Sequence, residues 1–271
     1  MRDARFLQNA ALDGVSYSYG GGLACVAETT QAHVATTSFD GNVAKGGPHA
    51  SGQGGGISVL QATLFLGQRV RFLGNIAAGD GSKPSGGGAL FVAEFPAVLL
   101  AEEATEFVQN VAEGAAPKGG ALLVIDSPKT VRLKGAEFGA NMVRALSGTG
   151  CGGAVSVDLG GDVRLDDCEF HDNTALMASD MAHDASGGAI CVGLNGRAWL
   201  VAGKMWSNQA GGGAPVHLLM LHSARQLCHD FEPAAFVLQL VSSTLPRCIR
   251  RQVIRTAKAA RRTSPSSLPA L

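Results

Sequence analysis

Three aspartates close together in the sequence are the first candidates for chemistry in this chain of 271 residues. Asp158, Asp166 and Asp167 form the one local cluster of carboxylates that is worth testing for catalysis. General acid–base catalysis, including glycoside hydrolysis, uses such carboxyl groups in pairs. They are therefore the residues that we would test first for an enzymatic activity.

Patterns that could bind a metal are weaker than this group of aspartates. His183 lies between Asp180 and Asp184, but a histidine beside carboxylates is common in surface loops. The six cysteines form no CxxC pair and no zinc-type Cys/His spacing, so neither a metal site nor a disulfide framework is indicated. We expect no cofactor. The cysteines are Cys25, Cys151, Cys168, Cys191, Cys228 and Cys248.

A repeat organises most of the chain, and its first half is an aromatic residue three positions before an asparagine. Successive asparagines are 31 to 35 residues apart, and a fixed period of this length is typical of stacked coils. The pairs are Phe6/Asn9, Phe39/Asn42, Phe72/Asn75, Phe107/Asn110, Phe138/Asn141 and Phe170/Asn173, with Met205/Asn208 as a variant.

The second half of the repeat is a pair of glycines before an aliphatic residue, as in Gly187-Gly188-Ala189-Ile190. The residues after each pair alternate as in a half-buried strand, with two aliphatic positions per strand. Stacked coils would join these positions into continuous core rows. Cys25 occupies a place that valine fills in the other repeats, so we interpret it as a core residue.

Each motif residue has a physical reason to recur. Asparagine tolerates a left-handed backbone at a corner, and its amide can bond to the asparagines of neighbouring coils. Glycine permits positive φ and a close approach of the backbone where the chain enters the next strand. Phenylalanines in register would stack as a ladder. We therefore expect the motif residues to be structural, with no catalytic residue among them.

The residue before each phenylalanine faces outward and is mostly charged. Stacking would align Glu106, Glu137 and Glu169, bracketed by Arg71 and Lys204. A column of carboxylates could hold calcium, which prefers oxygen ligands. A solvated acidic stripe is the favoured interpretation, because no glycine–aspartate loop of the calcium-binding type is present.

These patterns predict an all-β, right-handed, single-stranded parallel β-helix of about six coils over residues 1–216. We expect two strands in each coil, a third in the later coils, and variable loops between asparagine and glycines. Pro215 stands where an aliphatic residue is expected and removes a ladder donor, so the array should end there.

A dissimilar tail is predicted over residues 217–271. It holds 8 of the 22 basic residues, 2 of the 22 acidic residues and none of the 37 glycines. We expect a partly helical segment with a disordered end. Its basic residues could meet an anionic membrane or nucleic acid. Without interleaved aromatic residues, a solvated helix is favoured and we expect no nucleic-acid partner.

An outward row after the glycines is unusually apolar for an exposed sheet, with Leu60, Phe91, Leu123 and Ile125. An exposed apolar patch usually marks a partner surface or is covered by another part of the chain. We expect the tail, or another protein, to shield it. The outward positions contain one carboxylate, Asp158, among the twelve that the six repeats provide, which does not resemble a catalytic sheet.

The paired motifs resemble the repeat of the chlamydial polymorphic outer membrane proteins, of the pectin-lyase-like β-helix superfamily. The resemblance covers about residues 4–214. It implies a surface-exposed scaffold that takes part in adhesion to host cells. The outer-membrane barrel of that family should show alternating strands of about 10 residues, and none is visible in this sequence.

The function expected from these observations is a non-enzymatic, adhesin-like scaffold, extracellular or at the cell surface or outer membrane. We expect a monomer with a protein or glycan partner. The alternative is a degenerate carbohydrate-active β-helix. No stretch is long and apolar enough for a membrane span, and no signal peptide is visible. Since the chain begins within a repeat, we expect further sequence before it.

Overall fold

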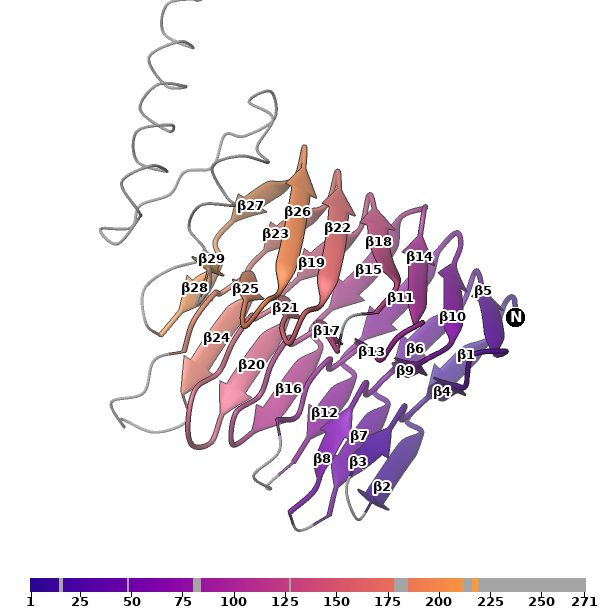
Figure 1. The fold of residues 1–271 in the computed structure, drawn as a ribbon, viewed down its shortest axis with the longest axis horizontal. Coiled ribbons are helices and arrows are strands. Elements are labelled where there is room, and N and C mark those ends of the chain that lie inside the picture. The colour runs from indigo at the N-terminus through magenta and orange to yellow at the C-terminus, as the bar shows by residue number, and fades with distance from the viewer. Residues whose placement is uncertain are drawn as a thin grey trace, which may run out of the picture. The chain divides into compact units, whose positions relative to one another are not determined.

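The computed structural model describes residues 1–14, 17–47, 49–79, 84–126, 128–177, 185–211 and 216–218. In these residues the chain forms a right-handed parallel β-helix of about six coils without any α-helix, as predicted. Figure 1 shows equivalent strands of successive coils lying side by side.

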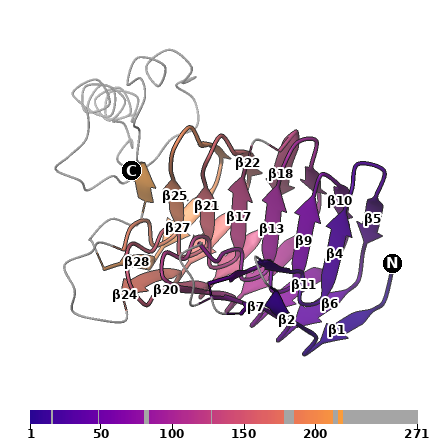
Figure 2. The same cartoon turned by 60° about the horizontal axis from the view of Figure 1, so that its bottom comes forward.

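Each coil passes through four parallel sheets in turn, which we name by their place in the repeat. The post-glycine sheet, seen side by side in Figure 2, contains β4 (Leu23–Val26), β9 (Ile57–Leu60), β13 (Leu90–Ala93), β17 (Leu122–Ile125), β21 (Val155–Val157), β25 (Ile190–Val192) and β29 (Val216–Leu218). The middle sheet contains β5 (Gln31–Val34), β10 (Thr63–Leu66), β14 (Val98–Ala101), β18 (Thr130–Lys134), β22 (Asp162–Asp166) and β26 (Arg197–Val201).

The other two sheets flank the asparagine. The phenylalanine sheet contains β1 (Arg5–Leu7), β6 (Ser38–Asp40), β11 (Val70–Leu73), β15 (Thr105–Val108), β19 (Glu137–Gly139), β23 (Glu169–His171) and β27 (Lys204–Trp206). The post-asparagine sheet contains β2 (Ala10–Gly14), β7 (Val43–Gly46), β12 (Ile76–Ala78), β16 (Val111–Gly114), β20 (Met142–Ala145), β24 (Thr174–Met177) and β28 (Gln209–Ala210).

The number of strands in each coil was underestimated. The middle sheet begins with β5 and so is not confined to the later coils. The post-asparagine strands lie where loops were expected. Their inward residues are mostly alanine and glycine, such as Ala112 and Gly114, which lack the bulky alternation that signals a strand. Backbone pairing with the neighbouring coils forms these strands despite their low intrinsic propensity.

The phenylalanines form the predicted ladder in the core. Neighbouring rings from Phe6 to Phe170 are stacked with centroids 4.6 to 5.0 Å apart and planes within 11°. Phe107 is fully buried, and Cys25 lies in the core beside Val59 as its sequence position predicted. Burial raises the pKa of the Cys25 thiol, which fits a packing role.

The asparagines form a second ladder along the corner. Asn141 donates from Nδ2 to Oδ1 of Asn173 at 2.9 Å and to the carbonyl of Phe107 at 2.8 Å. Its own Oδ1 accepts from the side chain and the backbone N–H of Asn110, both at 3.0 Å. Both amide hydrogens are used and the oxygen accepts two bonds, so this buried amide is fully satisfied.

The corner conformation differs from our expectation. The residue with positive φ is the one before each asparagine, for example Ala140 at 52° and Asp172 at 55°. The asparagine contributes its side-chain amide instead. The glycines behave as predicted: Gly187 has φ 65°, and a Cβ at Gly188 would collide with the carbonyl of Gln209 in the next coil.

A column of loop residues covers the outer face of the post-glycine sheet. Bridges connect Gln53, Gly86, Lys118, Cys151 and Ser186 from coil to coil. In the first coils the column continues as the pair β3 (Tyr17–Tyr19) and β8 (Ser51–Gln53).

This loop column corrects the prediction that the apolar row needs the tail as its cover. Phe91 is 3% exposed and Leu123 is 1% exposed. The ring of Tyr19 stacks on Phe91 at 6.1 Å, and Gly86 packs so closely on Leu123 that a Cβ would clash. The loops before the glycines therefore supply the cover.

The array also continues past Pro215. Val216 pairs with Ile190, so β29 adds another strand to the post-glycine sheet. Pro215 itself lies outside the described residues, and the pairing of the strand after it shows that the ladder does not end there. The rest of the predicted tail lies outside the described residues. No helix in the described part of the chain is long and apolar enough to cross a membrane.

Candidate functional site

Asp158 holds parts of the fold together. It follows β21 and is 6% exposed. Its carboxylate forms an ion pair with Lys118 of the loop column and accepts hydrogen bonds from the backbone N–H of Leu159 at 2.9 Å and of Leu194 at 2.6 Å. The carboxylate thus fixes the loop column and the turns of two coils, and these contacts occupy its oxygens.

Asp166 and Asp167 lie at the opposite end of β22 from Asp158, so the three aspartates do not meet in one site. Arg132 Nη2 and Arg164 Nε lie 3.0 and 2.9 Å from Asp166 oxygens. Burial raises the pKa of Asp166, but the hydrogen bonds from Arg164 and Arg132 outweigh it and hold the pKa below its usual value. Asp167 is exposed at the corner, with φ 53°.

The predicted acidic column is formed on the outer face of the phenylalanine sheet. Strand register places Glu106, Glu137 and Glu169 in line between Arg71 and Lys204. Arg71 Nε is 3.2 Å from Glu106, and Lys204 Nζ is 2.6 Å from Glu169. Each end of the carboxylate row therefore has its own cation.

The middle carboxylate has a histidine partner that sequence reasoning missed. His171 Nε2 lies 3.0 Å from Glu137 Oε1. All three carboxylates are thus paired, which favours the solvated stripe over the calcium site. Among the residues that the structure describes, no three His, Cys, Asp or Glu side chains are grouped as metal ligands. His183 and its neighbouring aspartates lie outside that part of the chain.

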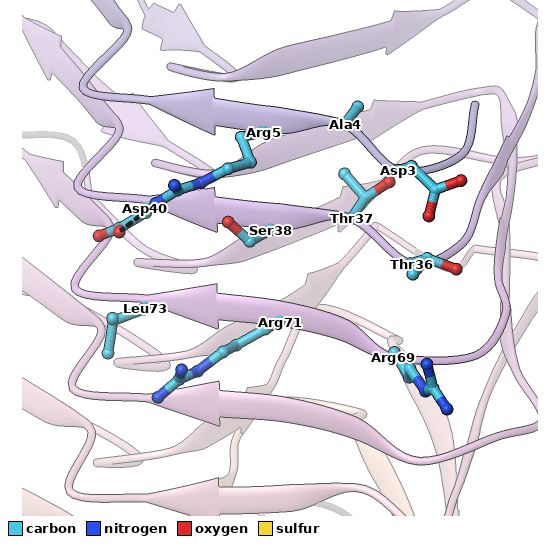
Figure 3. Close-up of a pocket in the computed structure, with 10 residues that line it drawn as sticks. All are labelled: Asp3, Ala4, Arg5, Thr36, Thr37, Ser38, Asp40, Arg69, Arg71 and Leu73. Carbon is cyan, nitrogen blue, oxygen red and sulfur yellow. Dashed lines mark ion pairs between the residues drawn. The ribbon is translucent and has the colours of Figure 1, made fainter.

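An open hollow of about 390 Å³ lies on the same face at its N-terminal end. Figure 3 shows Arg5 and Arg71 on the strands either side of Ser38. The short serine between two long side chains leaves the space. Arg5 lies 4.0 Å from Asp40, and Arg69 also lines the hollow. The guanidinium groups and hydroxyls could bind an anionic or hydroxyl-rich group.

A disulfide joins Cys151 of the loop column to Cys191 on the outer face of β25. The sequence analysis found no indication of a disulfide, because it relied on closely spaced cysteines and these two are 40 residues apart. The periodicity did contain a signal: Cys151 directly precedes a glycine pair, and Cys191 is one coil further on. Cys168 is buried, and burial raises its pKa to about 11.

The motif phenylalanines and asparagines of the inner coils do not contribute to any of these surfaces. Phe39, Phe72, Phe107, Phe138 and Phe170 are fully buried, as are Asn42, Asn75, Asn110, Asn141 and Asn173. In these coils the surface that a partner could reach is therefore formed by the residues between the motifs.

Comparisons with known protein families, with curated proteins and with solved structures found no match to this chain.

Proposed function

We propose that this protein is a non-enzymatic repeat scaffold that binds a protein or glycan through its outer faces, in the manner of an adhesin. One observation carries the proposal. The residues that recur in every coil point inward, whereas the outward residues of the same strands change from coil to coil. A rigid stack with a varied charged surface is suited to binding a specific protein or glycan.

The alternative is a degenerate carbohydrate-active β-helix. It requires a pair of carboxyl groups free to exchange protons near a substrate. Asp158 and Asp166 are each engaged by basic side chains, and Asp158 precedes the start of β22 whereas Asp166 is its last residue. This arrangement favours the scaffold.

An extracellular or cell-surface location is part of the proposal. Structural disulfides persist mainly in oxidising environments, so the Cys151–Cys191 bond supports it. The resemblance of the repeats to the chlamydial polymorphic outer membrane proteins points in the same direction. We propose this relationship, and the pectin-lyase-like superfamily with it, on the paired motifs alone.

The outer face of the phenylalanine sheet is the proposed contact surface. It combines the hollow between Arg5 and Arg71 with the column of paired charges. Ion pairs on an exposed sheet are worth little to stability, so a partner can replace them at small cost.

The test is to screen the purified full chain on glycan arrays and against extracts of surface proteins, and to incubate it with polygalacturonate. We expect binding without cleavage. Arg71→Ser should weaken that binding, and Arg144→Ser, on the post-asparagine sheet, should leave it unchanged. Cleavage that is lost in Asp166→Asn and Asp167→Asn variants would overturn the scaffold proposal in favour of the alternative.

A further inference from the structure

His171 occupies an unusual place on the outer face of β23. Its Nε2 faces Glu137 Oε1 of the preceding coil, and its Nδ1 faces Asp172 Oδ2, both at 3.0 Å. The ring stacks on Trp206 of the next coil, with centroids 5.0 Å apart and planes 11° from parallel. This side chain therefore touches three successive coils.

The position depends on a glycine beneath the ring. A Cβ at Gly139 would lie 2.7 Å from His171 Cε1, a distance that real side chains do not adopt. In the same column of other coils stand Val108 and Leu73, which would fill that space. Gly139 leaves the room that lets the imidazole lean toward Glu137.

The two hydrogen bonds define the protonation state. A neutral imidazole has one N–H, whereas an ionised carboxylate can only accept a hydrogen bond. Both contacts can exist together only when His171 carries a proton on each nitrogen. We propose that His171 is a proton-operated clasp, which holds both Glu137 and Asp172 beneath its stack on Trp206 when it is protonated and gives up one of the two carboxylates when it loses the proton.

The surrounding charges favour the closed form. Glu137 on β19 and Asp172 after β23 face the ring, while Lys204 on β27 is engaged by Glu169. Burial lowers the pKa of His171, but the hydrogen bonds and charges of Glu137 and Asp172 outweigh it, so the pKa is raised.

The direction of the pH effect follows from this shift. A group whose pKa is higher in the folded state stabilises the fold below its unfolded pKa, which is about 6.5 for histidine. That contribution is lost as the pH rises through the higher folded value. The clasp is therefore closed in acid and opens toward neutral or alkaline pH.

Trp206 provides a reporter for the test. The chain has two tryptophans, so Trp199→Phe leaves Trp206 as the single one. Its fluorescence should titrate with a midpoint above about 6.5, because the stacked ring changes charge. His171→Gln on this background should abolish the titration, and Glu137→Gln should move the midpoint to lower pH.

His33→Gln is the matched control, because His33 also stacks on an aromatic ring, that of Phe65, but lies on another sheet. The titration should survive this change. A flat fluorescence profile, a midpoint at or below the ordinary histidine value, or a titration that persists in His171→Gln would each overturn the proposal.

Urea unfolding gives a second measurement. The stability advantage of the parent over His171→Gln should be present in acid and vanish at alkaline pH. An advantage that stays constant across pH would show ordinary packing in place of a clasp and would also overturn the proposal.

Discussion

Neighbouring residues of one strand, Glu106 and Phe107, belong to two very different regions. Phe107 is fully buried between the rings of Phe72 and Phe138. Glu106 lies on the outer face, where its side chain is 51% exposed and pairs with Arg71. The inner column keeps phenylalanine over six consecutive coils, whereas the outer column changes residue and sign of charge.

The difference teaches that the recognisable motif and the functional surface are separate parts of each repeat. In the core, each motif residue must pack against its equivalents in the coils on either side, so the same residue type recurs. Outside, solvent screens the charges and exposed ion pairs contribute little. Substitutions should therefore be costly inside and cheap outside.

The largest effect is expected inside. Phe107→Ala removes a ring that contacts rings on both sides, and it should lower the free energy of unfolding by about 3–5 kcal/mol. Val108→Ala, at the next position on the outer face, is the control and should cost much less. Equal losses in urea titrations would break the distinction between the two columns.

The disulfide should come next. Replacing both Cys151 and Cys191 by serine should cost about 2–4 kcal/mol, because the bond restricts the unfolded chain. Reduction should destabilise the parent protein by a similar amount and leave the double variant unchanged. Recovery of the two thiols in free form, by mass spectrometry of a non-reducing digest, would contradict the bond.

The asparagine ladder should show an intermediate effect. Asn141→Ala should destabilise by roughly 1–3 kcal/mol, since Asn110, Asn173 and the carbonyl of Phe107 each lose a partner. Asn9→Ala, at an exposed asparagine, should cost less. An unchanged melting temperature in Asn141→Ala would refute the role assigned to the ladder.

The smallest effect is expected in the outer column. A double-mutant cycle on Arg71 and Glu106 should give a coupling below about 1 kcal/mol, because both side chains are half exposed. The coupling should fall as salt is added. A coupling comparable to that of the Asn141 contacts would show that the outer column also holds the fold together.

Periodic features could be predicted from the sequence because each coil repeats the same local problem. One period predicts the stacking of Phe107 in the phenylalanine ladder and of Asn141 in the asparagine ladder. It also predicts the core position of Cys25 and the alignment of Glu106 with Glu137. In such an array, knowing the register in one coil fixes it in the others.

Features that depend on non-repeated contacts could not be predicted in this way. The loop column has varied residues and lengths, so nothing local shows that Gly86 packs on Leu123 or that Lys118 meets Asp158. The post-asparagine strands were missed because alanine and glycine carry little strand signal. The His171 contacts require a glycine one coil earlier, which no single repeat shows.

The hydrogen bonds of the asparagine ladder have a direction along the stack. Each amide-to-amide hydrogen bond between Asn42 and Asn173 runs from Nδ2 of one coil to Oδ1 of the following coil, so these bonds all point the same way along the stack. Hydrogen bonds in such chains polarise one another and become stronger. A coil in the opposite orientation would place donor against donor, so the stack has a built-in polarity, comparable to the macrodipole of a helix but composed of side chains.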